Sequence, residues 1–216
     1  MSFTDSLLER NAALWQRMLD HPFLIQTRDG VISDEVFANW MRQDYLFVEA
    51  AIPMMGVLIA KAPTHHRKTL NDAIGGLLAE LDLFRERAEV AGVDLSGLTP
   101  SFTCHAYIQY LMASVYQGSY AEGFTVLYAG EKAYHESWKV VQSGLDPASK
   151  WYPFVENWAG DAFAEYVAFL ERELDGLAEG AGPDERRRMA SLFEYSVRYE
   201  IAFWEMALTA TTWPGV

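Results

Sequence analysis

Apolar residues recur along most of the chain at the three- and four-residue spacing of amphipathic helices. After Ser33, for example, Phe37, Trp40 and Met41 share one helical face. No window shows the sustained alternation of apolar and polar residues that is typical of a β-strand. We therefore predict an all-α fold of seven or eight helices. They are expected at about residues 4–19, from Ser33 onward, at 64–91, after Pro100, and at 120–143, 154–177 and 184–211.

Proline and glycine residues mark the expected boundaries between these helices. Pro22 and Gly30 end the first helix, and Pro53 predicts a kink within the long helix that begins at Ser33. The chain contains no internal repeat, no low-complexity tract and no linker of the kind that separates domains. We therefore expect one domain over residues 1–216, with its helices joined by short loops into antiparallel pairs.

Composition and charge narrow the class of protein. The chain has 216 residues, of which 50% are hydrophobic and 14% aromatic, so it can bury a large core with aromatic walls. Its formal net charge of −13 argues against nucleic-acid binding. One cysteine cannot form an internal disulfide, which fits a reducing compartment. The longest apolar run, residues 50–60, is too short to span a membrane. We expect a soluble cytoplasmic protein.

Three carboxylates lie among apolar residues on three predicted helices. The three are Asp44, Glu131 and Glu200, each with an aromatic residue three positions later: Phe47, Tyr134 and Phe203. If the helices face one another, the acids line one aromatic cavity, suited to a flat, amino-substituted or cationic heterocycle. Alternatively, each acid is a surface residue of an amphipathic helix, where most carboxylates lie. Spacing alone does not decide between these interpretations.

The segment AGEKAYHESW, residues 129–138, carries an unusually polar helical stripe. Its members are Glu131, Tyr134, His135 and Trp138. His135 is either a core histidine with satisfied hydrogen bonds or a group that orients Glu131. Cys104, one turn before Tyr107, is either a small buried apolar residue or a second pocket group. Paired Glu-x-x-His motifs, His-Glu-x-x-His, Cys-x-x-Cys and a glycine-rich phosphate loop are all missing, so we expect neither metal nor cofactor.

Three segments, in this order, resemble the TenA/thiaminase II family. They are HPFLIQTRDGVISDEVFANWMRQDYLF, HAYIQYLMASVYQGSYAEGFTVLYAGEKAYHESW and FEYSVRYEIAFWEMA, at residues 21–47, 105–138 and 193–207. The resemblance implies a heme-oxygenase-like all-α bundle that is usually a homotetramer, so we expect a homo-oligomer, either a tetramer or a dimer. It also implies cofactor-free hydrolysis in thiamin metabolism, at the bond between the pyrimidine's methylene or amino group and a leaving group. The expected partner is thus a small aminopyrimidine, with no nucleic acid or membrane involved.

The resemblance also implies roles for individual residues. Asp44 matches the acid that binds the aminopyrimidine ring, and Glu200 matches the catalytic acid near the leaving group. Tyr134 matches the tyrosine beside the catalytic position. The implied pocket residues are Tyr107 and Phe203, together with Phe47 and Trp158, which stand where the best-known branch has tyrosines.

The chain departs from the best-known branch at its nucleophile. That branch has a Pro-Cys pair where this chain has Ala129 and Gly130, so the nucleophilic thiol is missing. The sequence EKAYHESW instead resembles a second branch with the pattern Glu-x-x-Tyr-x-x-x-Trp, which begins at Glu131. This branch implies thiamin salvage, in which aminomethyl- or formylaminomethyl-pyrimidine is hydrolysed to hydroxymethylpyrimidine. Three alternatives remain: thiaminase II proper, a pyrroloquinoline quinone synthase-like oxidoreductase of the same fold, and a non-catalytic pyrimidine-binding protein.

The missing thiol leads to a hypothesis about mechanism. An aromatic pocket desolvates a carboxyl and raises its pKa towards the working range, so Glu131 is suited to act on water and on the leaving amine as general base and acid. Glu200 then polarises or protonates the second reactant. Asp44, held by ring N–H donors, is expected to stay ionised.

Overall fold

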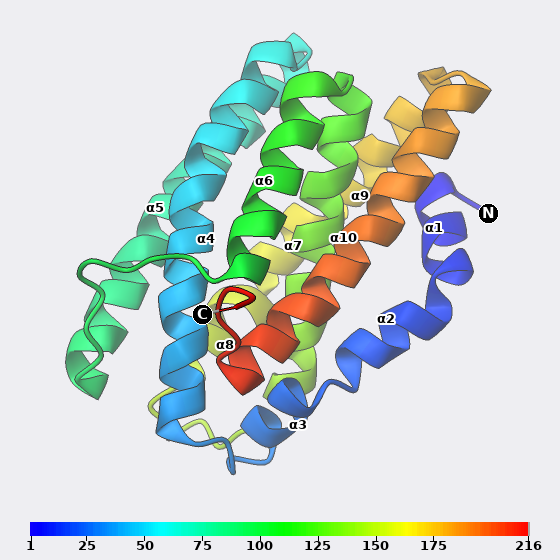
Figure 1. Ribbon diagram of the computed structural model, residues 1–216. Helices are drawn as coiled ribbons and strands as arrows, with labels where there is room; N and C mark the ends of the chain where they lie inside the picture. Colours follow the sequence, from blue (N-terminus) through cyan, green and yellow to red (C-terminus); the bar gives the residue numbers. More distant parts are fainter. Residues whose placement is uncertain (216) are drawn as a thin grey trace.

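The fold is built from helices alone. The computed structural model describes residues 1–215, and these form ten α-helices without a strand (Figure 1). The helices are α1 (Phe3–Arg10), α2 (Ala12–Leu19), α3 (Pro22–Arg28), α4 (Asp34–Lys61), α5 (Thr64–Ala91), α6 (Phe102–Gln117), α7 (Tyr120–Gln142), α8 (Tyr152–Ala159), α9 (Asp161–Gly180) and α10 (Pro183–Thr209).

The all-α prediction is confirmed, but ten helices replace the seven or eight expected. The predicted first helix is divided at Asn11, which ends α1 and precedes α2. The segment that begins at Pro22 was expected to be a break, yet it forms α3, because proline suits the first helical turn and His21 Nδ1 caps it by accepting the Phe23 N–H. Gly160, in an extended conformation, divides the predicted helix 154–177 into α8 and α9.

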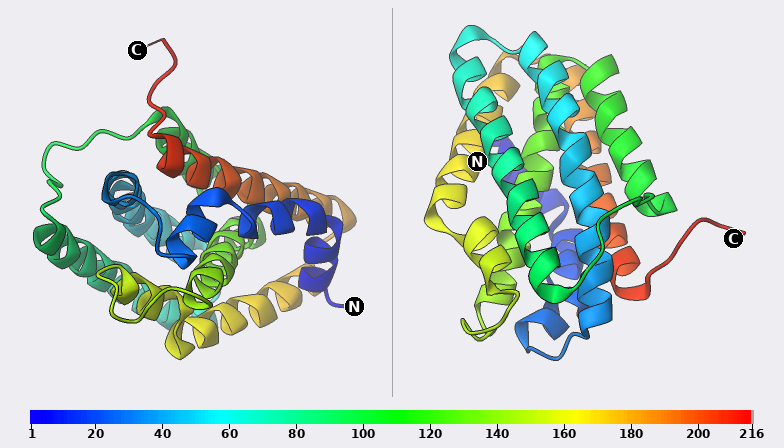
Figure 2. Two further views of the ribbon diagram at one scale, coloured as in Figure 1. Left: turned by 90° about the horizontal axis from the view of Figure 1, so that it is seen from below. Right: turned by 90° about the vertical axis from the view of Figure 1, so that its left-hand side faces the viewer.

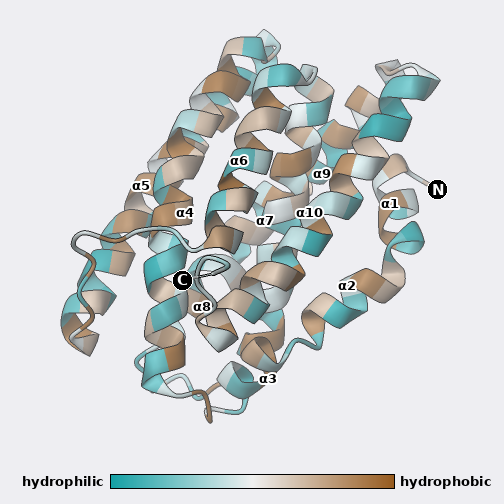
Figure 3. Ribbon diagram, viewed as in Figure 1, coloured by the Kyte–Doolittle hydropathy of each residue, from teal (hydrophilic) through white to brown (hydrophobic). Residues whose placement is uncertain are grey.

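Helix α7 runs through the middle of the bundle. It packs against α10, α9, α8, α6 and α3, and in the view from below it lies between α10 and α9 (Figure 2, left). Every residue from 121 to 129 is buried, as expected for a helix that is covered on all sides. Hydrophobic and hydrophilic residues follow one another along the helices, as the hydropathy-coloured ribbon shows (Figure 3).

Helix α4 is long and apolar enough, by length and composition, to cross a membrane. It packs against α5, α6 and α10 as a helix of the bundle, and it carries the fully buried carboxyl of Asp44. The helix continues through Pro53 without ending there. A core helix with a buried acid is the better description of this segment.

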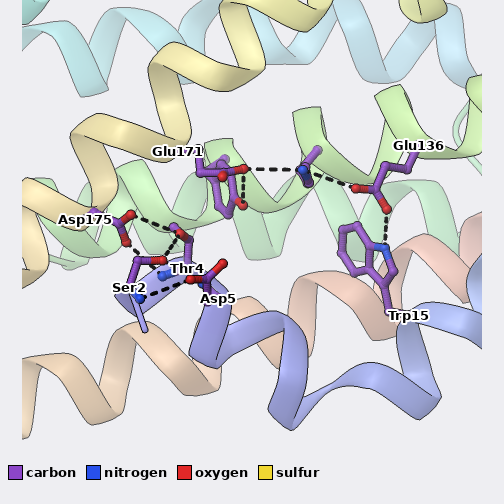
Figure 4. Close-up of polar contacts among 9 residues, drawn as sticks. Ser2, Thr4, Asp5, Trp15, Glu136, Glu171 and Asp175 are labelled. Atoms are coloured by element: carbon purple, nitrogen blue, oxygen red, sulfur yellow. Dashed lines mark hydrogen bonds and ion pairs between the residues drawn. The ribbon is translucent and has the colours of Figure 1, made fainter.

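A polar network on the outer side of α7 ties it to the N-terminal helices and to α9 (Figure 4). Trp15 Nε1 on α2 donates to Glu136 Oε2 at 2.5 Å, and Lys132 lies between Glu136 (3.1 Å) and Glu171 (3.3 Å). On α1, Thr4 donates its backbone N–H to Asp175 Oδ1 at 2.8 Å. These contacts fix the rotation of α7 about its axis and so set the direction in which its opposite face points.

An aromatic cluster fills the lower part of the bundle and supports the residues of the site. Trp158 stacks on Phe154 with 5.8 Å between ring centroids and on Trp138 with 5.2 Å. Tyr134 lies edge-on to Trp158 at 5.6 Å and stacks on Trp204 at 5.3 Å. Aromatic contacts of this kind favour a single packing arrangement, so these rings form a rigid support.

Candidate active site

A cavity of about 410 Å³ lies inside the bundle, with walls from α4 to α10. It collects seven of the eight site residues expected from the sequence: Asp44, Phe47, Tyr107, Glu131, Tyr134, Trp158 and Glu200. The eighth, Phe203, does not line the cavity. Its ring packs against Phe47 at 5.4 Å between centroids, so Phe203 supports the wall from behind.

The three acids therefore converge, but they have different surroundings. Asp44 on α4 accepts a hydrogen bond from Tyr134 Oη at 2.5 Å, and Glu200 on α10 accepts one from Tyr107 Oη at 2.5 Å. In both carboxylates the second oxygen, Oδ2 or Oε2, is buried and has no partner in the described chain. Each acid is thus held at one oxygen and presents a free acceptor at the other.

Glu131 is the acid without a fixed partner. Among residues 1–215 its carboxyl makes no hydrogen bond, and the exposed part of its side chain faces the cavity. Burial raises its pKa to about 8, with further increases from the neighbouring charges of Glu80 and Glu200. A carboxyl with a pKa in this range can both take up and release a proton near neutral pH.

The two tyrosine-bound acids are also desolvated. Burial raises the pKa of Glu200 to about 8, although the Tyr107 hydrogen bond opposes this rise. Burial likewise raises the pKa of Asp44 well above its ordinary value, against the lowering effect of the Tyr134 hydrogen bond. Burial therefore opposes ionisation of Asp44 more strongly than the single tyrosine favours it. That Asp44 is ionised when ring N–H donors hold it stays a prediction.

The charged residues among the mostly apolar lining of the cavity are all acids. Its lining contains no Lys, Arg or His, so the carboxyls have no basic counter-charge within it. His135, one turn from Glu131, instead hydrogen-bonds through Nδ1 to the Trp158 carbonyl oxygen at 2.8 Å, as a core histidine would. Such a site favours ligands that are cationic or rich in N–H donors.

Cys104 is buried outside this lining. Its thiol donates to the Gln43 carbonyl oxygen at 3.4 Å, and burial raises its pKa to about 12. Of the two interpretations left open by the sequence, the structure supports that of a small buried apolar residue. Cys104 is therefore not positioned as a nucleophile.

Potential metal ligands gather elsewhere. Within residues 1–215, one group of His and acidic side chains has ligand atoms within 4.8 Å of one another: His65, His66 and Glu173. This group does not line the cavity. Both ring nitrogens of His66 already have partners, Tyr120 Oη at 2.8 Å and Glu173 Oε2 at 3.0 Å.

Five polar residues of the cavity were missed in the sequence: Thr69, Asp72 and Glu80 on α5, Asn157 on α8 and Tyr166 on α9. For Glu80 a weaker signal existed: it shares a helical face with Leu77 and Phe84, but its aromatic neighbour follows four positions later and not the three positions that mark the other acids. Asn157 and Tyr166 offered no such signal, since asparagine and tyrosine are common at partly exposed helical positions.

Comparison with known proteins places this cavity in a family. The TENA/THI-4/PQQC family matches residues 8–210. The chain is 29% identical to an aminopyrimidine aminohydrolase of Halalkalibacterium halodurans, over 99% of this chain and 98% of that protein. It is 28% identical to an aminopyrimidine aminohydrolase of Bacillus subtilis, over 99% of this chain and 92% of that protein.

Solved structures agree with this assignment. A TenA homologue from Pyrococcus furiosus superposes with a TM-score of 0.92 at 36% identity, covering 95% of this chain and 99% of that one. A heme oxygenase-like domain from Shewanella denitrificans, at 16% identity, has a TM-score of 0.72 and covers 94% of this chain and 91% of that one. The second likeness concerns the fold alone. The chain therefore belongs to the TENA/THI-4/PQQC family and has the heme-oxygenase-like fold.

Proposed function

We propose that this protein is a hydrolase of thiamin salvage that converts aminomethyl- or formylaminomethyl-pyrimidine into hydroxymethylpyrimidine. One observation carries the proposal: three acids on three helices converge on one cavity, and only Glu131 lacks a hydrogen-bonding partner within residues 1–215. Relatives that span nearly the whole chain are aminopyrimidine aminohydrolases, which supports the same substrate class.

Recognition of the pyrimidine falls to Asp44. Its Oδ2 is buried without a partner, and Tyr134 fixes the other carboxylate oxygen. An aminopyrimidine supplies the N–H donors that this oxygen lacks, and each charge-assisted hydrogen bond favours the ionised acid. Phe47, Tyr107 and Trp158 provide flat apolar surfaces beside the ring.

The chemical step assigned to this site replaces an amine by water. Glu131 takes a proton from water as the water oxygen bonds to the methylene carbon. The C–N bond breaks, the amine leaves with the bonding electron pair, and a proton from Glu200 neutralises it. The products are the hydroxymethylpyrimidine and ammonia, or formamide when the amine is formylated. No thiol or cofactor takes part in this sequence.

We also propose that the protein acts as a cytoplasmic homo-oligomer that binds neither nucleic acid nor membranes. Its net charge of −13 disfavours association with phosphate backbones or anionic lipids.

The function is tested by giving the protein aminomethylpyrimidine, formylaminomethylpyrimidine and thiamin separately, and by following the products by chromatography. We expect hydroxymethylpyrimidine from the first two substrates. Glu131→Gln keeps the shape of the side chain but removes its proton transfer, so we expect kcat to fall by about 100-fold or more.

The matched control is Glu165→Gln, an exposed residue of α9 outside the cavity, where normal turnover is expected. A Glu131→Gln enzyme with full activity would contradict the assigned role of Glu131. Cleavage of thiamin alone would support thiaminase II, and an oxygen-dependent product would support an oxidoreductase instead.

A further inference from the structure

A second polar group lines the cavity and has no part in the chemistry described above. Glu80, Asn157 and Tyr166 come from α5, α8 and α9, whereas Asp44 and Glu200 come from α4 and α10. Glu131 belongs to α7, the helix that runs through the middle of the bundle. The charges of Glu80 and Glu200 both raise its pKa. The cavity thus has two polar walls. We call the set of Glu80, Asn157 and Tyr166 the outer wall.

Tyr166 is the most informative member of the outer wall. Its hydroxyl is buried, lines the cavity and has no hydrogen-bonding partner within residues 1–215. Buried hydroxyls are normally paired, because an unpaired one loses its hydrogen bonds to water without replacement. Burial raises the pKa of Tyr166 well above its ordinary value, and the neighbouring charges of Glu131 and Glu80 raise it further. The group is therefore a phenol that keeps its proton and lacks an acceptor.

Glu80 is held in place beside this hydroxyl. Asn157 Nδ2 donates to Glu80 Oε1 at 3.0 Å, which fixes one carboxyl oxygen and directs the side chain into the cavity. Burial raises the pKa of Glu80 to about 7, so its protonated form, which can also donate, is well populated at neutral pH. The outer wall consequently offers hydrogen-bond donors, while the Asp44 side of the cavity offers acceptors.

The size of the cavity allows a ligand to reach both walls. About 410 Å³ falls within the range of sites that hold drug-sized ligands, so space remains beside a single substituted pyrimidine ring. The ligand group that fits the outer wall is an oxygen acceptor connected to the reacting nitrogen. A free amine has no such oxygen, whereas an N-acyl group carries one directly beside the nitrogen.

We propose that Tyr166, Glu80 and Asn157 form a leaving-group subsite for the acyl oxygen of N-acylated aminomethylpyrimidines. Tyr166 donates its O–H to the acyl oxygen, and Glu80, positioned by Asn157, lies beside it. This proposal rests on the proposed function and specifies the substrate class of the same site. In the balanced step, water adds its oxygen to the methylene carbon and gives a proton to Glu131. The C–N bond breaks, and the carboxamide departs with a proton from Glu200 on its nitrogen.

The test compares two substrates in one variant. Tyr166→Phe keeps the ring and removes only the hydroxyl. We expect its kcat/KM for formylaminomethylpyrimidine to fall by about 10-fold, because the acyl oxygen loses its donor, while kcat/KM for the free amine stays unchanged. Tyr128→Phe is the matched control, since this buried tyrosine on α7 bonds to Glu171 outside the cavity, and neither substrate should be affected.

Binding measurements keep the test decisive if turnover is slow. By calorimetry, the acylated ligand should bind Tyr166→Phe about 10-fold more weakly than it binds the wild type. The free amine should bind the two proteins with equal affinity. Equal losses for both ligands, or none for the acylated one, would overturn the subsite and leave the proposed function intact. If the wild type neither binds nor hydrolyses the free amine, the proposed function itself fails.

Discussion

The two polar walls of the cavity use similar residues in opposite ways. On the side of α4 and α10, each carboxyl accepts a hydrogen bond from a tyrosine: Asp44 from Tyr134 and Glu200 from Tyr107. On the side of α5 and α9, the tyrosine and the carboxyl are both present, but Tyr166 donates to no acceptor in the described residues and Glu80 binds Asn157 instead. Donors are thus used up on one wall and left free on the other.

This difference shows how one acidic cavity can bind two kinds of group. A carboxylate whose first oxygen is held by a tyrosine has a fixed direction, so its second oxygen is a preorganised acceptor for ligand N–H groups. A tyrosine without a protein acceptor is a donor for ligand oxygen. Glu131 lies on α7, and its pKa is raised by charges on both walls. This position between the walls is where the bond between the ring and the leaving group would be placed.

Removing the charged acceptor at Asp44 should have the largest effect on ligand binding. Asp44→Asn can still accept from Tyr134, so we expect normal folding, but it loses the charge that binds the pyrimidine. We expect affinity for aminomethylpyrimidine to fall by about 100-fold, the scale of lost hydrogen bonds to a charged group. Calorimetry of ligand binding, with circular dichroism for folding, measures both effects.

Cys104→Ser is the matched control, because this buried side chain bonds to the backbone of Gln43, next to Asp44, but lies outside the cavity. We expect its substrate affinity to match that of wild type. If Asp44→Asn bound the ligand normally, the acceptor side of the comparison would be wrong.

The sequence was sufficient for the fold class and for seven of the residues that line the cavity. Helical periodicity and the segments shared with the family identified seven cavity residues, since both depend on local spacing. The short helices were harder. Asn11 and Gly160 end helices within otherwise continuous apolar patterns, and their effect depends on how the flanking segments pack.

The pairing of the side chains was beyond sequence reasoning. Asp44, Glu131 and Glu200 each have an aromatic residue three positions later. None of these acids is hydrogen-bonded to that aromatic neighbour. Tyr134, which follows Glu131, binds Asp44 across the cavity. Such contacts depend on the relative rotation of α4, α7 and α10, which a one-dimensional pattern does not contain.

The pH profile of turnover tests the effect of the Glu80 charge on Glu131. Burial is the main cause that raises the pKa of Glu131 to about 8, and the negative charge of Glu80 is the second. Removing that charge in Glu80→Gln makes the Glu131 proton easier to lose, so the pKa falls. Since Glu131 acts as a base only when deprotonated, the rising limb of kcat/KM should move to lower pH, by about 0.5–1 unit.

The remaining groups that face Glu131 and Glu80 stay in place in this variant: Asp44, Tyr166, Asn157 and Glu200. Glu86→Gln, an exposed substitution on the same helix outside the cavity, should leave the profile unchanged. A shift to higher pH in Glu80→Gln would mean that Glu80 stabilises the charged form of Glu131, contrary to the arrangement described.

A substitution at Gly130 should change turnover least. This glycine stands where the best-known branch of the TenA/thiaminase II family has its cysteine. A Cβ at this position would lie 3.8 Å from both Glu200 Oε1 and Tyr107 Oη, an ordinary contact distance. Gly130→Ala should therefore fold and gain about 0.5–1 kcal/mol in unfolding free energy from helix propensity. Gly75→Ala, in α5 with open space around its Cβ, should gain the same. Because only the Gly130 methyl enters the cavity beside Glu200, only this variant should lose turnover, by about two- to threefold. Equal turnover in the two variants, measured beside their urea denaturation, would place the reacting atoms away from Gly130.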